Sequence, residues 1–177
     1  AREAVRLARR LALPLEGYTA DGGFFVEGDS PLLEAHQRLL GVEAEGADLL
    51  RLSSPVVRLK VLAEGEDPVE RLLEALPRGL QAHVAESPKM PGVRFVSLTK
   101  EGVSKLSAAR LVAEAYGLPL SECAMVGDGE NDLELLRAVG VGIAMGNAPP
   151  SVKRAAQRVV APVEACGLAE ALRLLRG

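Results

Sequence analysis

The segment from Ala124 to Asp132 joins an apolar run to a cluster of oxygen-bearing side chains. Ala-Met-Val-Gly leads directly into Asp-Gly-Glu-Asn-Asp, at the start of a predicted helix. Open α/β sheets bind ligands just past the carboxyl ends of their strands, and carboxylate oxygens suit Mg²⁺. The pattern therefore predicts a magnesium site, with Asp128 as a direct ligand and Asp132 behind it.

Two glycines, Gly127 and Gly129, flank Asp128, and we expect them to support the site by letting the backbone turn tightly near the ion. A second interpretation of the same segment stays open. Helix caps and first turns favour Asp and Asn, so the cluster also fits a turn followed by an acidic helix start.

Two neighbouring segments favour the site. Lys105 follows Thr99-Lys-Glu-Gly-Val-Ser at a predicted helix N-terminus, where a lysine can hold a phosphate as a mobile point charge. Asn147 lies in Met145-Gly-Asn-Ala-Pro-Pro, again after a short strand and before a helix, and is expected to support the site. Taken singly, Lys105 also fits a solvated surface lysine, and Asn147 a helix cap.

The elements that must position these residues alternate regularly after Thr99. Such βα alternation predicts a parallel sheet with helices on its faces. The expected elements are helix 104–116, strand 122–126, helix 131–139, strand 141–145, helix 151–157 and helix 168–175.

The earlier part of the chain has an α+β pattern. Helical spacing predicts helices at 2–11, 31–40 with Ser30 as its cap, and 68–76 with Asp67 as its cap. Alternation predicts strands at 55–63, 80–85 and 93–98, and two short strands around the tight turn Ala20-Asp-Gly-Gly.

Composition narrows the function classes. The 177 residues carry a net charge of −3, without the basic patch that nucleic-acid binding usually needs, and no apolar stretch approaches the length of a membrane span. Cys123 and Cys166 lie far apart without a CxxC pattern, so neither a disulfide framework nor a zinc site is expected. We expect a cytoplasmic protein with no nucleic-acid or membrane partner; a homodimer stays open.

Gly-Val-Ser-Lys, Gly-Asp-Gly-Glu-Asn-Asp and Met-Gly-Asn-Ala, in this order and spacing, resemble the haloacid dehalogenase (HAD) superfamily of phosphatases, in its Cof-type sugar-phosphatase branch. The resemblance covers about residues 98–160 with specific motifs and 1–26 with weak ones. It implies that Lys105 stabilises a phosphorylated aspartate and the incoming phosphate, and that Asp128 binds Mg²⁺. It further implies that Asn131 contacts phosphate and Asp132 braces the metal site. Leu106 stands where the family usually has glycine.

The family's nucleophile motif, Asp-x-Asp-x-Thr, does not occur in the 177 residues. The nearest sequence, Thr19-Ala-Asp-Gly-Gly, has threonine at the attacking position and is better explained as a turn. We therefore expect that a strand-helix-strand segment precedes Ala1, and that the 177 residues alone are inactive.

These observations predict an α/β fold with a Rossmann-like parallel-sheet core of residues 1–29 and 99–177 and an inserted α+β cap of residues 30–98. The expected function is Mg²⁺-dependent hydrolysis of a small phosphomonoester, such as a sugar phosphate, through an aspartyl-phosphate intermediate. Two alternatives remain: a phosphoglycolate or sugar-acid phosphatase, and a non-catalytic protein that binds Mg²⁺ and phosphate compounds.

Overall fold

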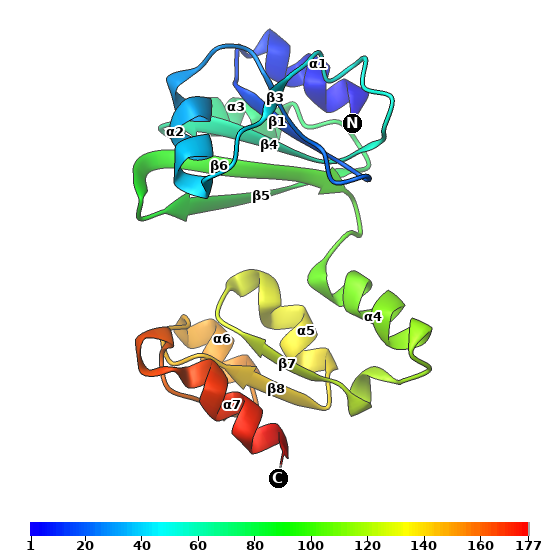
Figure 1. The fold of residues 1–177 in the computed structure, drawn as a ribbon, viewed down its shortest axis with the longest axis vertical. Helices are drawn as coiled ribbons and strands as arrows, with labels where there is room; N and C mark the ends of the chain where they lie inside the picture. Colours follow the sequence, from blue (N-terminus) through cyan, green and yellow to red (C-terminus); the bar gives the residue numbers. More distant parts are fainter. Residues whose placement is uncertain (177) are drawn as a thin grey trace. The chain divides into compact units, whose positions relative to one another are not determined.

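The computed structural model describes residues 1–176 and divides into two compact units (Figure 1). The first extends from Ala1 to Glu101, and the second begins at Gly102. No helix in the described part of the chain is long and apolar enough to cross a membrane.

The first unit is built on a six-stranded sheet in the order β3-β2-β1-β4-β6-β5. All neighbours are antiparallel except β2 and β3, which are parallel. The strands are β1 (Leu15–Thr19), β2 (Phe24–Glu27), β3 (Glu45–Gly46), β4 (Val56–Glu64), β5 (Leu80–Ser87) and β6 (Met90–Lys100).

Three helices pack on this sheet: α1 (Arg2–Arg10), α2 (Pro31–Leu40) and α3 (Asp67–Glu74). α1 and α3 contribute to the main apolar core, which includes Leu7, Leu72 and, from the sheet, Val61 and Val96. α2 packs in a separate cluster with Leu62 and Phe95. Because side chains alternate along a strand, α2 covers part of the opposite face of the sheet from α1 and α3.

The sequence predicts the starts of these helices unequally well. Ser30 caps α2 as expected, its Oγ accepting a hydrogen bond from the amide of Leu32. The expected cap at Asp67 is wrong, because Asp67 is already helical in α3 and the residue before it, Glu66, makes no side-chain capping bond. A proline at position 68 fits the first turn, so the helix can begin one residue earlier.

The segment Thr19 to Gly23 is a turn, as the sequence predicts. The Thr19 hydroxyl donates to Asp21 Oδ1 at 2.5 Å, and the Thr19 amide donates to the Gly23 carbonyl. Gly22 has a φ of +89°, which glycine adopts without steric cost. These contacts give Asp21 a turn-forming function within the β1–β2 hairpin.

The second unit is built on the parallel sheet β7-β8-β9. Its elements are β7 (Ala124–Gly127), β8 (Val141–Ala144), β9 (Arg158–Val159), α4 (Lys105–Ala115), α5 (Leu133–Ala138), α6 (Pro150–Ala155) and α7 (Gly167–Arg176). Short 3₁₀ turns at Leu120–Glu122, Glu130–Asp132 and Val163–Ala165 connect them. The predicted helices and strands are all present, whereas the two-residue β9 is too short to give a pattern.

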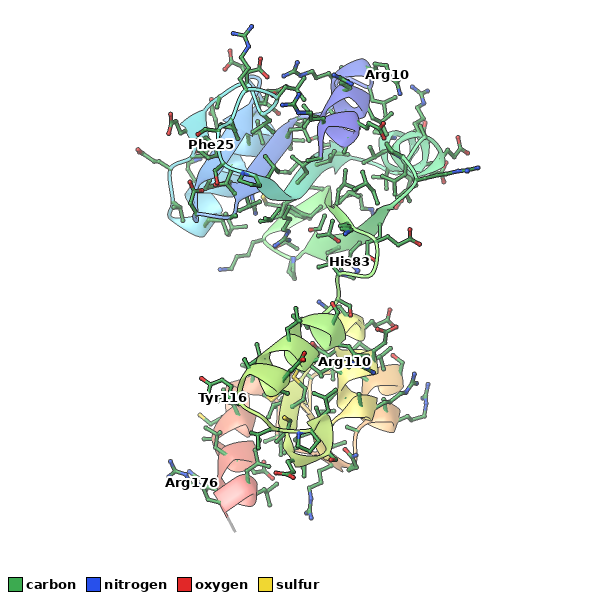
Figure 2. The ribbon with its side chains drawn as sticks, turned by 90° about the vertical axis from the view of Figure 1, so that its right-hand side faces the viewer. Arg10, Phe25, His83, Arg110, Tyr116 and Arg176 are labelled. Atoms are coloured by element: carbon green, nitrogen blue, oxygen red, sulfur yellow. The ribbon has the colours of Figure 1, made fainter. Side chains whose placement is uncertain are left out.

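Helices cover both faces of this sheet (Figure 1). Leu136 of α5 and Val152 of α6 pack with Ala144 on one face, and Ala171 of α7 packs with Ile143 on the other. β7 is an edge strand, and the segment of residues 105–118 next to it, which comprises α4 and the turn after it, exposes four large apolar side chains. These are Leu111, Val112, Tyr116, which Figure 2 labels, and Leu118, just beyond the helix.

The structure corrects the predicted domain assignment at the N-terminus. The sequence predicts residues 1–29 in one core with residues 99–177, whereas in the structure they belong to the first unit together with residues 30–98. The reason is strand pairing: β1 pairs with β4 in the six-stranded sheet, and α1 buries its apolar face in the same core. The predicted boundary near residue 99 lies close to the observed division at Glu101.

Candidate functional site

The candidate site lies at the carboxyl edge of the parallel sheet of the second unit. Asp128 directly follows β7, and Asn147 lies three residues past the end of β8. Because β7 and β8 are parallel neighbours, both side chains are at the same edge. The sheet therefore brings together two segments that are 19 residues apart in sequence.

Lys105 is positioned by the start of α4. Ser104 caps this helix, accepting from the Ser107 amide, while the Ser107 hydroxyl accepts from the Ser104 amide. This capping box fixes Lys105 as the first helical residue. The Lys105 ammonium donates to Asp132 Oδ1 at 2.5 Å, and its side chain remains 47% exposed.

Asp132 is the buried centre of the site, with a relative exposure of 2%. Besides the contact with Lys105, its Oδ2 accepts from the backbone amides of Asp128 at 3.1 Å and Gly129 at 3.0 Å. Burial alone would raise the pKa of the Asp132 carboxyl. The hydrogen bonds from Lys105, Gly129 and Asp128 outweigh burial, so its pKa lies below the ordinary value.

Asp128 is exposed and is held by Asn147. The Asn147 Nδ2 donates to Asp128 Oδ2 at 3.2 Å. The Asn147 Oδ1 in turn accepts from the Val163 amide at 3.1 Å, which orients the amide group. Asn147 thus links Asp128 to the segment that follows β9, and it is a connector rather than a helix cap.

Gly127 and Gly129 serve the site for a different reason from the one the sequence predicts. Neither has a positive φ, so no unusual backbone conformation requires glycine. A Cβ on Gly127 would lie 2.7 Å from Asp132 Oδ2, and one on Gly129 would lie 2.5 Å from Asn131 Oδ1. Gly127 is needed for space, because the buried Asp132 side chain packs against its Cα atom, whereas the exposed Asn131 side chain can turn away from a Cβ at Gly129.

Asn131, the predicted phosphate contact, is exposed on the 3₁₀ turn beside Asp128. Its neighbour Glu130 accepts a hydrogen bond from the Ser151 hydroxyl of α6 at 3.3 Å. The structure therefore links Lys105, Asp128, Asp132 and Asn147 by direct hydrogen bonds and places Asn131 next to them.

The donor set fits a magnesium ion held by few protein ligands. Among residues 1–176, no three His, Cys, Asp or Glu side chains are grouped closely enough to hold a metal. Both oxygens of Asp132 already accept hydrogen bonds, so its carboxylate faces the protein. Asp128 is exposed and offers a carboxylate to a hard cation, which usually keeps several of its waters.

Sequence reasoning missed two contacts of the site. One is the hydrogen bond from the Val163 amide to Asn147, and the other is the hydrogen bond from Ser151 to Glu130. Both depend on how the segments that follow neighbouring strands meet in space. The residue type at position 163 does not reveal that its backbone amide donates a hydrogen bond. Serine and glutamate are common on protein surfaces, so their presence does not indicate a contact. Only the strand order makes these contacts visible.

Known proteins resemble this chain in sequence and in fold. Residues 60–172, about two thirds of the chain, match the family model of haloacid dehalogenase-like hydrolases. An HMP-PP phosphatase of Cronobacter sakazakii is 30% identical over 137 residues, covering 75% of this chain and 48% of its own length. A phosphoglycolate phosphatase of Archaeoglobus fulgidus is 41% identical over 73 residues, covering 41% and 33%.

A solved structure extends the similarity over almost the whole chain. A phosphatase of the haloalkanoate (HAD) superfamily from Bacteroides thetaiotaomicron has a TM-score of 0.74 and 28% sequence identity. The match covers 97% of this chain and 62% of that protein. The chain therefore spans less than half of both curated relatives and less than two thirds of this solved structure.

Proposed function

Because the chain belongs to the haloacid dehalogenase-like hydrolases, we propose that its protein is a Mg²⁺-dependent phosphatase that hydrolyses a small phosphorylated metabolite. The observation that carries the proposal is the network of Lys105, Asp132, Asp128 and Asn147 at one sheet edge. The network connects Lys105, a cation suited to phosphate, with Asp128, a carboxylate suited to a metal ion.

Each residue has a distinct function in this proposal. Asp128 holds the Mg²⁺, which supplies positive charge against the transferring phosphoryl group. Lys105 neutralises charge on the phosphoryl oxygens, and Asn131 donates a hydrogen bond to them. Asp132 does not react: it fixes the Lys105 ammonium and the backbone amides of the Asp128 loop. Asn147 orients the Asp128 carboxylate.

The attacking group comes from outside the 177 residues in this proposal, since no Asp-x-Asp-x-Thr occurs among them. Support comes from the relatives, which extend well beyond the matched part. In the aspartyl-phosphate route, an aspartate oxygen attacks phosphorus and the alcohol leaves with a proton. Water then releases inorganic phosphate and regenerates the aspartate.

Sugar phosphates are the leading substrates, because the motifs resemble the Cof-type branch. Phosphoglycolate and other sugar-acid phosphates are the second candidate, supported by the relative named phosphoglycolate phosphatase. Substrate profiling of the purified protein with both classes, compared by kcat/KM, separates them.

The deciding experiment measures the intact mass of the protein produced from its own gene, together with Mg²⁺-dependent hydrolysis of an aryl phosphate. We expect turnover, and we expect a metal chelator to abolish it. Asp128→Ala and Lys105→Ala should each lower the turnover rate by roughly a thousandfold. Wild-type turnover in either variant would show that the site is misplaced.

The rival of another class is a protein that binds Mg²⁺ and phosphate compounds without reacting, motivated by the missing nucleophile motif. This alternative predicts that calorimetry detects phosphate binding, and that the binding is lost when Lys105 is replaced. It also predicts that the pure protein hydrolyses no phosphate ester. Sustained hydrolysis that disappears in Asp128→Ala rejects it.

A further inference from the structure

The first unit contains a group of ionisable side chains that the proposed phosphatase chemistry does not use. Glu16 and Tyr18 lie two residues apart on β1, and Lys60 and Arg58 lie opposite them on β4. Side chains two residues apart share a face of the sheet. With Ser97, opposite Lys60 on β6, we call these residues the Tyr18 cluster.

At the base of the cluster, Glu16 is completely buried. Its Oε1 lies 2.5 Å from His36 Nδ1 of α2, and its Oε2 accepts from the Tyr18 hydroxyl at 2.7 Å. No buried side-chain nitrogen or oxygen of the described residues lacks a hydrogen-bond partner, so the carboxylate is fully satisfied. A buried carboxylate is costly, and of the two cations of the cluster, Lys60 and Arg58, it is Lys60 that forms an ion pair with it.

Those two cations share one aromatic ring. The Lys60 ammonium and the Arg58 guanidinium each lie 5.5 Å from the centre of the Tyr18 ring. Phe24 of β2 stacks on the same ring at 4.9 Å. Because both charges are positive and adjacent, they repel each other, and the only acid in the cluster is Glu16.

The cations retain capacity for another acceptor. Lys60 lies 3.6 Å from Glu16 Oε2, longer than a direct hydrogen bond, although its side chain is only 13% exposed. Arg58 is exposed and donates to Ser97 Oγ at 2.7 Å through one nitrogen, Nη2. Burial, and then Arg58, lower the pKa of Lys60, while Glu16 opposes this shift. An anion placed between the two cations would relieve their repulsion.

We propose that the Tyr18 cluster binds a small anion bearing a carboxylate or phosphate group. Arg58 supplies a planar pair of donors for two oxygens of the anion, and Lys60 supplies a point charge held in place by Glu16. His83, labelled in Figure 2, lies opposite Ser97 on β5 and adds a further polar group at the border of the cluster.

Charge complementarity, rather than apolar area, selects this occupant. The cluster presents two cations around one ring, and Arg58 among them is exposed, which suits a ligand with one or two acidic groups. The proposal stands independently of the proposed phosphatase function, because the binding is measured directly and without turnover.

The absence of tryptophan and the presence of only two tyrosines make a direct test possible. Tyr116 is 78% exposed in the second unit, so Tyr116→Phe leaves Tyr18 as the only tyrosine fluorophore. In this background, the 177-residue chain is titrated with malonate, with sodium chloride at matched ionic strength as the salt control. We expect a saturable change of Tyr18 emission with malonate that chloride does not reproduce.

Two variants and a matched control identify the residues responsible. Lys60→Met and Arg58→Gln should each weaken malonate binding by roughly tenfold or more. Lys100→Met should leave it unchanged, because Lys100 is an exposed lysine that alternation places on the other face of β6. Circular dichroism checks that each variant is folded, and Arg58→Gln keeps the test decisive if the loss of Lys60 prevents folding.

A titration with inorganic phosphate distinguishes the two chemical sources. Binding of malonate alone assigns a carboxylate ligand, and binding of phosphate, lost in Arg58→Gln, assigns a phosphoryl ligand. The proposal is overturned if neither anion changes the Tyr18 emission more than chloride does. It is also overturned if the emission of Arg58→Gln changes as much as that of the protein without this substitution.

Discussion

The Lys105 ammonium and the Asp132 carboxylate form an ion pair at 2.5 Å, between the first residue of α4 and the 3₁₀ turn after β7. The pair joins segments 27 residues apart, and its acid is buried while its base is half exposed. In this arrangement Asp132 is the fixed partner, and Lys105 is the group that a ligand can reach.

Asp132→Asn should destabilise the second unit by about 2 kcal/mol, because an amide in this position sets a donor against Lys105. Urea unfolding followed by circular dichroism measures the loss. Asp128→Asn is the matched control, since Asp128 is exposed, and its effect should stay within about 0.5 kcal/mol. Equal losses of unfolding free energy in the two variants would contradict the conclusion that Asp132 is the buried, fixed residue and Asp128 the exposed one.

Gly127→Ala should disturb the site through volume alone. Its Cβ would meet the Asp132 side chain at 2.7–2.8 Å, and the backbone conformation itself suits alanine. We expect a loss of about 1–3 kcal/mol in unfolding free energy. Gly46→Ala is the control, because Gly46 also lacks a positive φ and its added Cβ meets nothing within 4 Å. A neutral Gly127→Ala would show that Asp132 can move freely.

Asn147→Ala should weaken Mg²⁺ binding roughly tenfold by releasing the Asp128 carboxylate, as loss of groups that orient metal ligands commonly does. Calorimetric titration with Mg²⁺ gives this value without any turnover. Ser151→Ala is the comparison, since Ser151 contacts Glu130 rather than Asp128, and it should retain wild-type affinity. Unchanged affinity in Asn147→Ala would leave that residue with a purely structural function.

Alkaline pH should destabilise the first unit through Tyr18. Burial, then the hydrogen bond to Glu16, raise the pKa of Tyr18 above the ordinary 10.0. The stabilisation is therefore fully present below pH 10.0 and is lost as the pH rises through the folded pKa. Lys60 acts oppositely, because its lowered pKa is a penalty that fades as the pH rises towards 10.5.

Comparison with Tyr18→Phe isolates the tyrosine contribution from that of Lys60. Phenylalanine removes the hydroxyl, so the variant should be less stable by about 1 kcal/mol at neutral pH. The difference between the two proteins should shrink above pH 10.0. Urea midpoints across this range measure it, and a difference that does not change with pH would refute the prediction.

The sequence was sufficient for the second unit because local signals agree with the fold there. Alternating apolar runs and helix starts predict β7, α5 and β8, and the chemistry-bearing residues follow the strand ends directly. Lys105 was found because it stands at a helix start, although its pairing with Asp132 depends on tertiary structure.

The first unit shows where such reasoning stops. Nothing local in the hairpin of β1 and β2 states which sheet it joins, and its pairing with β4 is a long-range contact. The same holds for Glu16, an acidic residue in a short strand whose burial becomes evident only when His36 and Lys60 are placed around it. Residue type and spacing predict helices and strands, whereas the strand order determines which side chains meet in a site.

The edge of β7 has a consequence for handling the protein. Only β8 pairs with it in the described sheet, and apolar side chains of α4 are exposed nearby. Open strand edges are templates for pairing with other chains. Solutions of the 177-residue chain should therefore scatter light increasingly with concentration, so the titrations above require dilute samples whose dispersity has been checked.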